Sequence, residues 1–186
     1  MRDRLRRWFE LALVWGLPVW GLLWLFVPVI LSRFDLCPGD RGDGRLNLYF
    51  LEHARLWLAG APGYESFWNA PFYYPLSDVM SYSDLLLGLG PFYWVLRWFG
   101  DEFTALQLLT ALLALLNYLA MYWLLRTALG CIRPAAAAGA FLFAFAPPRL
   151  QVVGHLQMFA QFYPVLLELL LVLAWRWRRR RLPAAL

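Results

Sequence analysis

The sequence of 186 residues contains no lysine, only two cysteines and few charged residues. All 17 of its basic residues are arginine, and 16% of its residues are charged. Cys37 and Cys131 are too few for a disulfide framework, and neither has the second ligand spacing of a zinc site. The chain also lacks a P-loop, a Rossmann glycine pattern and a Ser-His-Asp arrangement with supporting context, so no common nucleotide-binding or serine-hydrolase signature applies.

Apolar and aromatic residues are abundant instead. Hydrophobic residues make up 62% of the chain, with 11 Trp, 9 Tyr and 14 Phe, and the mean hydropathy is +0.53. This composition is typical of a membrane protein. The net charge of +5 does not indicate a nucleic-acid partner, because the arginines stand at the ends of apolar segments and therefore follow membrane topology. We expect membrane lipids as partners and no nucleic acid.

The long apolar segments predict an all-α polytopic membrane protein with about four transmembrane helices. The first apolar run is too long for the h-region of a signal peptide, and no small-residue cleavage site follows it. The three basic clusters, Met1–Arg7, Arg126–Arg133 and Arg176–Arg181, are predicted to lie inside by the positive-inside rule, which makes the N-terminus cytoplasmic. The predicted spans are residues 8–31, 102–126, 134–147 and 158–175.

Residues 32–101 are predicted to form a long exterior loop, in which acidic residues outnumber basic ones. Residues 43–58 have helical periodicity and precede Gly60, and residues 85–99 are apolar but short for a span. We therefore expect two interfacial helices in this loop, the second of which is alternatively re-entrant. In the first, the predicted apolar face holds Leu46, Tyr49, Phe50, His53 and Trp57, and Asn47, Glu52 and Arg55 are predicted to lie elsewhere.

A series of short motifs in a fixed order resembles the GT-C superfamily of membrane glycosyltransferases. After the first helix come GDRGDGRL from Gly39, PFYYP from Pro71 and YSD from Tyr82, and later FAFAP from Phe143 and GHLQ from Gly154. This order is similar to that of bacterial integral membrane proteins akin to the protein O-mannosyltransferases and the aminoarabinose transferases. It covers residues 8–177, and because family enzymes are longer, the chain is expected to be the N-terminal module of a larger fold.

The resemblance implies an enzyme of the bacterial inner membrane that takes a sugar from a polyprenyl-phosphate donor. The lipid-linked sugar is transferred to an acceptor at the outer face, and the sequence identifies neither the sugar nor the acceptor. A carboxylate in the first exterior loop then takes the acceptor proton or orients the nucleophile. Asp43 is our first candidate for this catalytic base and Asp40 the second. The alternatives are a helix N-cap for Asp43 and a turn residue for Asp40.

Other polar residues are candidates for substrate binding, each with a structural alternative. His53 on the apolar face is more often a hydrogen-bonded interfacial histidine, and Asp84 is more readily a cap for the second interfacial helix. Arg149 is equally well an anchor of a helix end in the headgroups. Hydrogen-bond donors near His155 in the sequence are of the kind that would stabilise a carrier phosphate. The predicted substrate-binding residues are Glu52, His53, Asp84, Arg149, His155 and Gln157.

No cofactor is predicted. A divalent metal on Asp40, Asp43 and the phosphate is conceivable, because hard cations choose carboxylates, but the sequence contains no dense ligand set. Two other functions stay open: a transporter or flippase subunit for lipid-linked sugars, and a structural membrane protein without catalysis. A transporter typically places its polar residues at mid-membrane in broken helices, whereas here the acids gather in the exterior loop.

Overall fold

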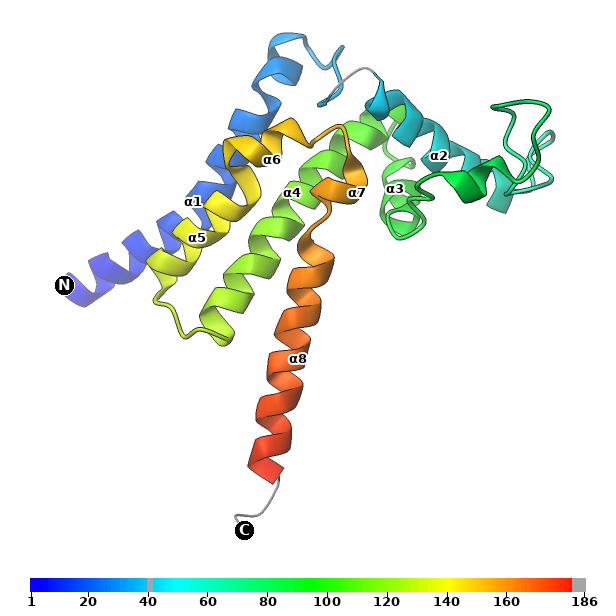
Figure 1. The fold of residues 1–186 in the computed structure, drawn as a ribbon. Helices are drawn as coiled ribbons and strands as arrows, with labels where there is room; N and C mark the ends of the chain where they lie inside the picture. Colours follow the sequence, from blue (N-terminus) through cyan, green and yellow to red (C-terminus); the bar gives the residue numbers. More distant parts are fainter. Residues whose placement is uncertain (40–41, 182–186) are drawn as a thin grey trace. The chain divides into compact units, whose positions relative to one another are not determined.

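The computed structural model describes residues 1–39 and 42–181, which form helices joined by turns and contain no strand (Figure 1). The all-α fold class predicted from the sequence is confirmed. The helices are α1 (Arg2–Leu31), α2 (Asp43–Leu58), the 3-10 helix η1 (Val79–Tyr82), α3 (Gly90–Leu96), α4 (Glu102–Thr127), α5 (Arg133–Phe145), α6 (Pro147–Gln151), α7 (Leu156–Phe159) and α8 (Phe162–Arg181).

Three helical stretches of the described residues are long and apolar enough to cross a membrane: α1, α4 and the stretch Leu156–Arg179, which covers α7 and most of α8. Their lengths are 30, 26 and 24 residues. At about 1.5 Å per residue, each exceeds the roughly 30 Å of a hydrocarbon core. The chain is therefore a multi-pass membrane protein.

The fourth predicted span, residues 134–147, is not long enough to cross. It corresponds to α5, which has 13 residues and therefore a length of about 20 Å. The helix ends because Ala146 is extended, with ψ of 152°, and two prolines follow it. The structure thus provides three candidate spans instead of the predicted four.

The chain divides into two compact units, which we describe separately. Unit 1 consists of residues 1–27, 112–150 and the residues from Ala160 onward, and unit 2 consists of residues 28–111 and 151–159. In unit 1, α5 lies beside α1 (Figure 1), where the rings of Trp20 and Phe141 stack with centroids 5.3 Å apart. Four alanines of α5 are fully buried, and such small residues allow helices to approach closely.

The three basic segments meet at one end of unit 1. Arg133 at the start of α5 lies 3.6 Å from Glu10 near the start of α1, measured between Nη1 and Oε2. Arg176 of α8 donates hydrogen bonds to the carbonyl oxygens of Thr127, the last residue of α4, and of Ala128, the residue after it. The start of α5 therefore lies beside the first turns of α1, and α8 lies beside the end of α4.

The first predicted interfacial helix has the predicted bounds, but its buried face differs. Helix α2 runs over Asp43–Leu58 and ends where Gly60 adopts φ of 64°. Leu46, which we expected on the apolar face, is 43% exposed, whereas Asn47 is only 4% exposed. Helical periodicity shows which residues share a face, but it does not show that a polar residue has a buried hydrogen-bond partner. Asn47 is buried because its side chain binds the Gly154 carbonyl oxygen.

The second predicted interfacial helix, residues 85–99, is much shorter than expected. Only α3, Gly90–Leu96, is helical there, followed by turns. Leu86 has φ of 51°, which interrupts a right-handed helix, and the proline after Gly90 suits the first turn of a new one. With seven residues, α3 is no membrane-spanning element.

Candidate functional site

Two of the predicted site residues, Asp43 and His155, lie in contact in unit 2. The Nδ1 atom of His155 is 3.1 Å from Oδ2 of Asp43. The side chains are 38% and 47% exposed, so water and small groups reach both. A carboxylate beside Nδ1 fixes the orientation of an imidazole, and the contact is an ion pair when the ring is protonated and a hydrogen bond when it is neutral.

Asp43 is the first helical residue of α2, and it does not occupy the N-cap position. The N-cap is Gly42, without a side-chain hydrogen bond, so the capping alternative for Asp43 does not hold in this structure. A carboxylate in the first turn is favourable near the positive end of the helix macrodipole. The start of α2 therefore presents the Asp43 carboxylate toward His155.

His155 is placed by the segment of residues 151–159, which belongs to unit 2 although it is remote in sequence from the rest of that unit. His155 immediately precedes α7, and its carbonyl oxygen accepts the backbone N–H groups of Met158 and Phe159 at 2.9 Å each. The preceding residue, Gly154, lies against Gly39: a Cβ on Gly39 would be 2.6 Å from the Gly154 Cα. Gly39 also has φ of 102°, so both its conformation and this close approach require glycine.

Asp84 and Gln157, also predicted site residues, form a second pair in unit 2. The Nε2 of Gln157 donates a hydrogen bond of 2.9 Å to Oδ2 of Asp84 on the exposed surface. Asp84 does not cap the second interfacial helix, because α3 begins only at Gly90 and has its N-cap at Leu89. His155 and Gln157 are two residues apart, so both predicted pairs are made by one short segment of chain.

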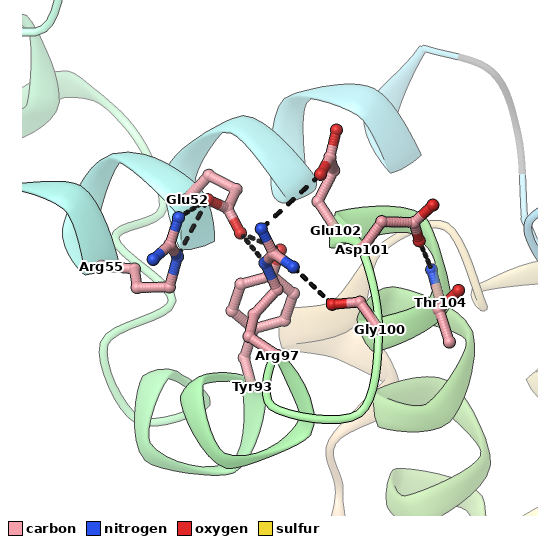
Figure 2. A network of polar contacts seen from close by, with 8 residues as sticks. All are labelled: Glu52, Arg55, Tyr93, Arg97, Gly100, Asp101, Glu102 and Thr104. Carbon is pink, nitrogen blue, oxygen red and sulfur yellow. Dashed lines mark hydrogen bonds and ion pairs between the residues drawn. The ribbon is translucent and has the colours of Figure 1, made fainter.

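Glu52 lies in a dense network of polar contacts within unit 2 (Figure 2). Its Oε2 accepts hydrogen bonds from Nε and Nη2 of Arg55, at 2.9 and 2.7 Å. Its Oε1 accepts hydrogen bonds from the Tyr93 hydroxyl and from Nε of Arg97, each at 2.6 Å. Arg97 also donates to the Gly100 carbonyl at 2.5 Å and lies 3.7 Å from Glu102. These contacts connect α2 to α3 and to the start of α4.

The network determines the ionisation of its members. Burial by itself raises the pKa of the Glu52 carboxyl, but the hydrogen bonds from Arg55, Tyr93 and Arg97 outweigh burial and hold that pKa below its usual value. Burial, together with the hydrogen bond to Glu52, raises the pKa of the Tyr93 phenol, so the hydroxyl stays protonated and donates. Because four donors already occupy the Glu52 carboxylate, the geometry favours a structural role over the substrate-binding role that we predicted.

His53 is 2% exposed, on the buried side of α2. Its Nε2 lies 2.9 Å from the Phe67 carbonyl oxygen, and because a carbonyl only accepts, Nε2 carries the hydrogen. The rings of Tyr49, Tyr64 and Phe67 surround it, with centroids 5.5 to 5.9 Å away. This geometry agrees with the structural alternative for His53 and leaves little access for a substrate.

Arg149 belongs to α6 in unit 1. Its Nε donates to the Phe143 carbonyl at 3.1 Å, and its guanidinium carbon lies 4.9 Å from the centroid of the Phe143 ring. Burial lowers the pKa of Arg149. Its predicted role at the carrier phosphate stays a prediction.

The second candidate base, Asp40, lies outside the described residues. Within residues 1–39 and 42–181, no three His, Cys, Asp or Glu side chains are grouped so that they would hold a metal ion. The Cys37 and Cys131 thiols are both free.

Three residues that organise this region were missed in the sequence: Asn47, Tyr93 and Arg97. Asn47 was predicted to lie away from the apolar face of α2. Its position one turn after Asp43 places both residues on the same side of the helix. Tyr93 and Arg97 are one turn apart at the end of an apolar segment, which gave a weak signal for a buried polar contact.

The chain matches no family model, no curated protein and no solved structure. The resemblance to the GT-C superfamily therefore stays a prediction that depends on the order of the short motifs.

Proposed function

We propose that the chain is part of a GT-C-type glycosyltransferase that transfers a sugar from a polyprenyl-phosphate donor to an acceptor at the outer face of a bacterial inner membrane. The observation that carries the proposal is the contact between Asp43 and His155, with 3.1 Å between Oδ2 and Nδ1. An exposed carboxylate–imidazole pair at the end of a helix is suited to general base catalysis.

In the proposed reaction, an acceptor hydroxyl or amine attacks the anomeric carbon of the lipid-linked sugar. The bond between the anomeric carbon and the carrier phosphate oxygen breaks, and the phosphate leaves with the electron pair. The acceptor's proton passes to Nε2 of His155, while Asp43 accepts the hydrogen on Nδ1 and stabilises the imidazolium that forms. Among the described residues Nε2 of His155 has no hydrogen-bond partner, which supports this assignment.

The orientation in the membrane follows from the same proposal. The basic ends of α1, α5 and α8 meet in unit 1 through Arg133, Glu10 and Arg176, and the positive-inside rule places such an end in the cytoplasm. The N-terminus is then cytoplasmic. The acid-rich residues that follow α1 are then on the outer side, where carrier-linked sugars are used.

The proposal is tested by transfer from radiolabelled mannosyl and glucosyl polyprenyl phosphates in proteoliposomes, with bacterial envelope extract as the acceptor source. Asp43→Asn and His155→Gln, introduced separately into the full-length protein, are each expected to lower the rate roughly 100-fold or more, because each removes the proton acceptor or its partner. Both variants are expected to remain folded, since both side chains are substantially exposed.

Asp78→Asn is the matched control. Asp78 is an exposed acid of the same unit with φ of 56°, a conformation that asparagine adopts readily, so the same loss of charge is expected to leave transfer unchanged. Turnover of Asp43→Asn equal to that of the wild type would reject the pair as the catalytic base. A transfer rate lowered equally by Asp78→Asn would show that loss of any acid in unit 2 has the same effect.

A further inference from the structure

The structure assigns Asn47 as a positioning residue that holds His155 against Asp43, an inference that depends on the proposed function for its catalytic meaning but not for its geometry. The side chain of Asn47 donates its hydrogen bond to the Gly154 carbonyl oxygen. It acts through the peptide group that precedes His155.

The key contact is a hydrogen bond between distant parts of unit 2. Nδ2 of Asn47 donates to the Gly154 carbonyl oxygen at 2.5 Å, and Asn47 is only 4% exposed. The Gly154 carbonyl belongs to the peptide bond whose nitrogen is that of His155. Fixing this carbonyl therefore fixes the peptide plane from which the His155 side chain projects.

Helix α2 contacts both the His155 ring and the peptide group before it, because of where Asp43 and Asn47 lie on the helix. The two residues are four positions apart, so they lie one turn from each other on the same side of α2. Asp43 thus contacts the His155 ring while Asn47 binds the backbone just before it. The spacing of the two contacts is set by the pitch of one helical turn, about 5.4 Å.

Two further contacts limit the movement of the same segment. On one side, Gly39 approaches Gly154 so closely that a Cβ would be 2.6 Å from the Gly154 Cα. On the other, Gln157 donates to Asp84 at 2.9 Å. Of the two hydrogen bonds, only the one from Asn47 is buried, so it is the one that water replaces less well.

The test uses histidine ring signals, because the chain has only two histidines, His53 and His155. The full chain, labelled with 13C and 15N in histidine, is examined by NMR in detergent micelles, and the His155 signals are assigned by their loss in His155→Gln. Asn47→Asp keeps the size of the side chain but replaces the donor with a carboxylate oxygen. We expect it to move the His155 ring signals as Asp43→Asn does, and to leave those of His53 in place.

Asn69→Asp is the matched control. Asn69 is an exposed residue of unit 2 whose Oδ1 accepts the Asp78 N–H at 2.7 Å, and aspartate keeps that acceptor. It introduces the same charge and is expected to leave both histidines unchanged. Asn47→Leu removes the donor without adding charge and is expected to reproduce the shift of the His155 signals. If Asn47→Asp displaces the His53 signals as well, its added charge has a wider effect. The positioning role is then judged from the His155 signals of Asn47→Leu alone.

In the transfer assay, Asn47→Asp and Asn47→Leu are expected to lower kcat roughly 10- to 100-fold with the KM for the lipid-linked donor unchanged, since a small misplacement of a catalytic group has an effect of this size. His155 signals that stay in place in both Asn47 variants while Asp43→Asn moves them would overturn the positioning role and leave the pair intact. Signals that none of the three variants moves would overturn the positioning role as well. Because the spectra need no substrate, a failure of the transfer assay alone would count only against the proposed function.

Discussion

At the residue scale, Glu52 of unit 2 is held by four hydrogen bonds. Both of its oxygens are occupied by donors from Arg55, Tyr93 and Arg97, and its side chain is only 17% exposed. A carboxylate so far removed from water is stable only when it is well paired. Glu52 therefore ties α2 to α3, and with α2 it holds Asp43 and Asn47 in their places.

This tie predicts a pH-dependent stability. The pKa of Glu52 is lowered in the folded chain, so its contribution is fully present above the ordinary carboxyl pKa and is lost as the pH falls through the lowered folded value. Glu52→Gln should lower the free energy of unfolding by roughly 2 kcal/mol at neutral pH, as expected for hydrogen bonds to charged groups. It should also flatten the dependence of Tm on pH in the acid range.

The measurement is tryptophan fluorescence of the detergent-solubilised chain during heating, between neutral pH and the acid limit of the folded state. Asp78→Asn is the control, because it removes a carboxylate that lies on the exposed surface of unit 2, outside the network around Glu52. Equal acid sensitivity in the wild type and in Glu52→Gln would contradict the assigned role of the network.

At the scale of single elements, α5 shows how a short helix is accommodated among long ones. Its alanines at 136, 137, 140 and 144 have no exposed surface, and Gly21 of α1 lies so close to the Phe145 ring that a Cβ there would be 2.5 Å from it. In a membrane, where apolar packing replaces the hydrophobic effect between helices, such close approach is the main source of association. The small size of these residues is therefore a packing requirement.

We predict that Ala140→Leu destabilises the chain by about 1 to 3 kcal/mol, because added methylenes force side chains or backbone to move in a filled interior. Ala138→Leu makes the same change two residues away at an exposed position of α5 and is expected to have little effect. The two Tm values in the same detergent give the comparison. A similar loss of Tm in both variants would show that helix propensity, rather than packing, is responsible.

At the scale of the whole molecule, the two units differ in how they are built from the sequence. Unit 2 consists mainly of one continuous stretch, residues 28–111, which residues 151–159 join from much later in the chain. The two candidate pairs, Asp43 with His155 and Asp84 with Gln157, both connect these separate stretches. The candidate site therefore forms only when residues that are far apart in the sequence come together in the fold.

The proposed orientation predicts which residues an impermeant reagent reaches in intact cells. In a chain with Cys37→Ser and Cys131→Ser, the added Ser77→Cys is expected to react with an impermeant maleimide from outside, because residue 77 is exposed in unit 2. A variant that keeps only Cys131, in the connection between α4 and α5, should react only after the membrane is permeabilised. Labelling of both from the same side would reject the orientation.

Several features of the fold could be predicted because they depend on local sequence. The apolar runs predicted α1 and α4 closely, and the periodicity after Asp43 predicted both ends of α2. Residues 85–99 and 134–147 were predicted less well. Composition there gave an apolar segment, but Leu86 in a left-handed conformation and the extended Ala146 shortened the helices.

The sequence by itself determined that this is an all-helical membrane protein with most of its acids in one segment, because hydropathy and charge are properties of each stretch of chain. Only the tertiary structure decided what the polar residues do. In the folded chain Asp43 contacts His155, and Asn47 donates a hydrogen bond to the Gly154 carbonyl oxygen. The Glu52 carboxylate is bound by Arg55, Tyr93 and Arg97. The physical reason is that long-range packing determines which partner a buried polar group finds. Helical periodicity describes only neighbours along one helix and does not identify that partner.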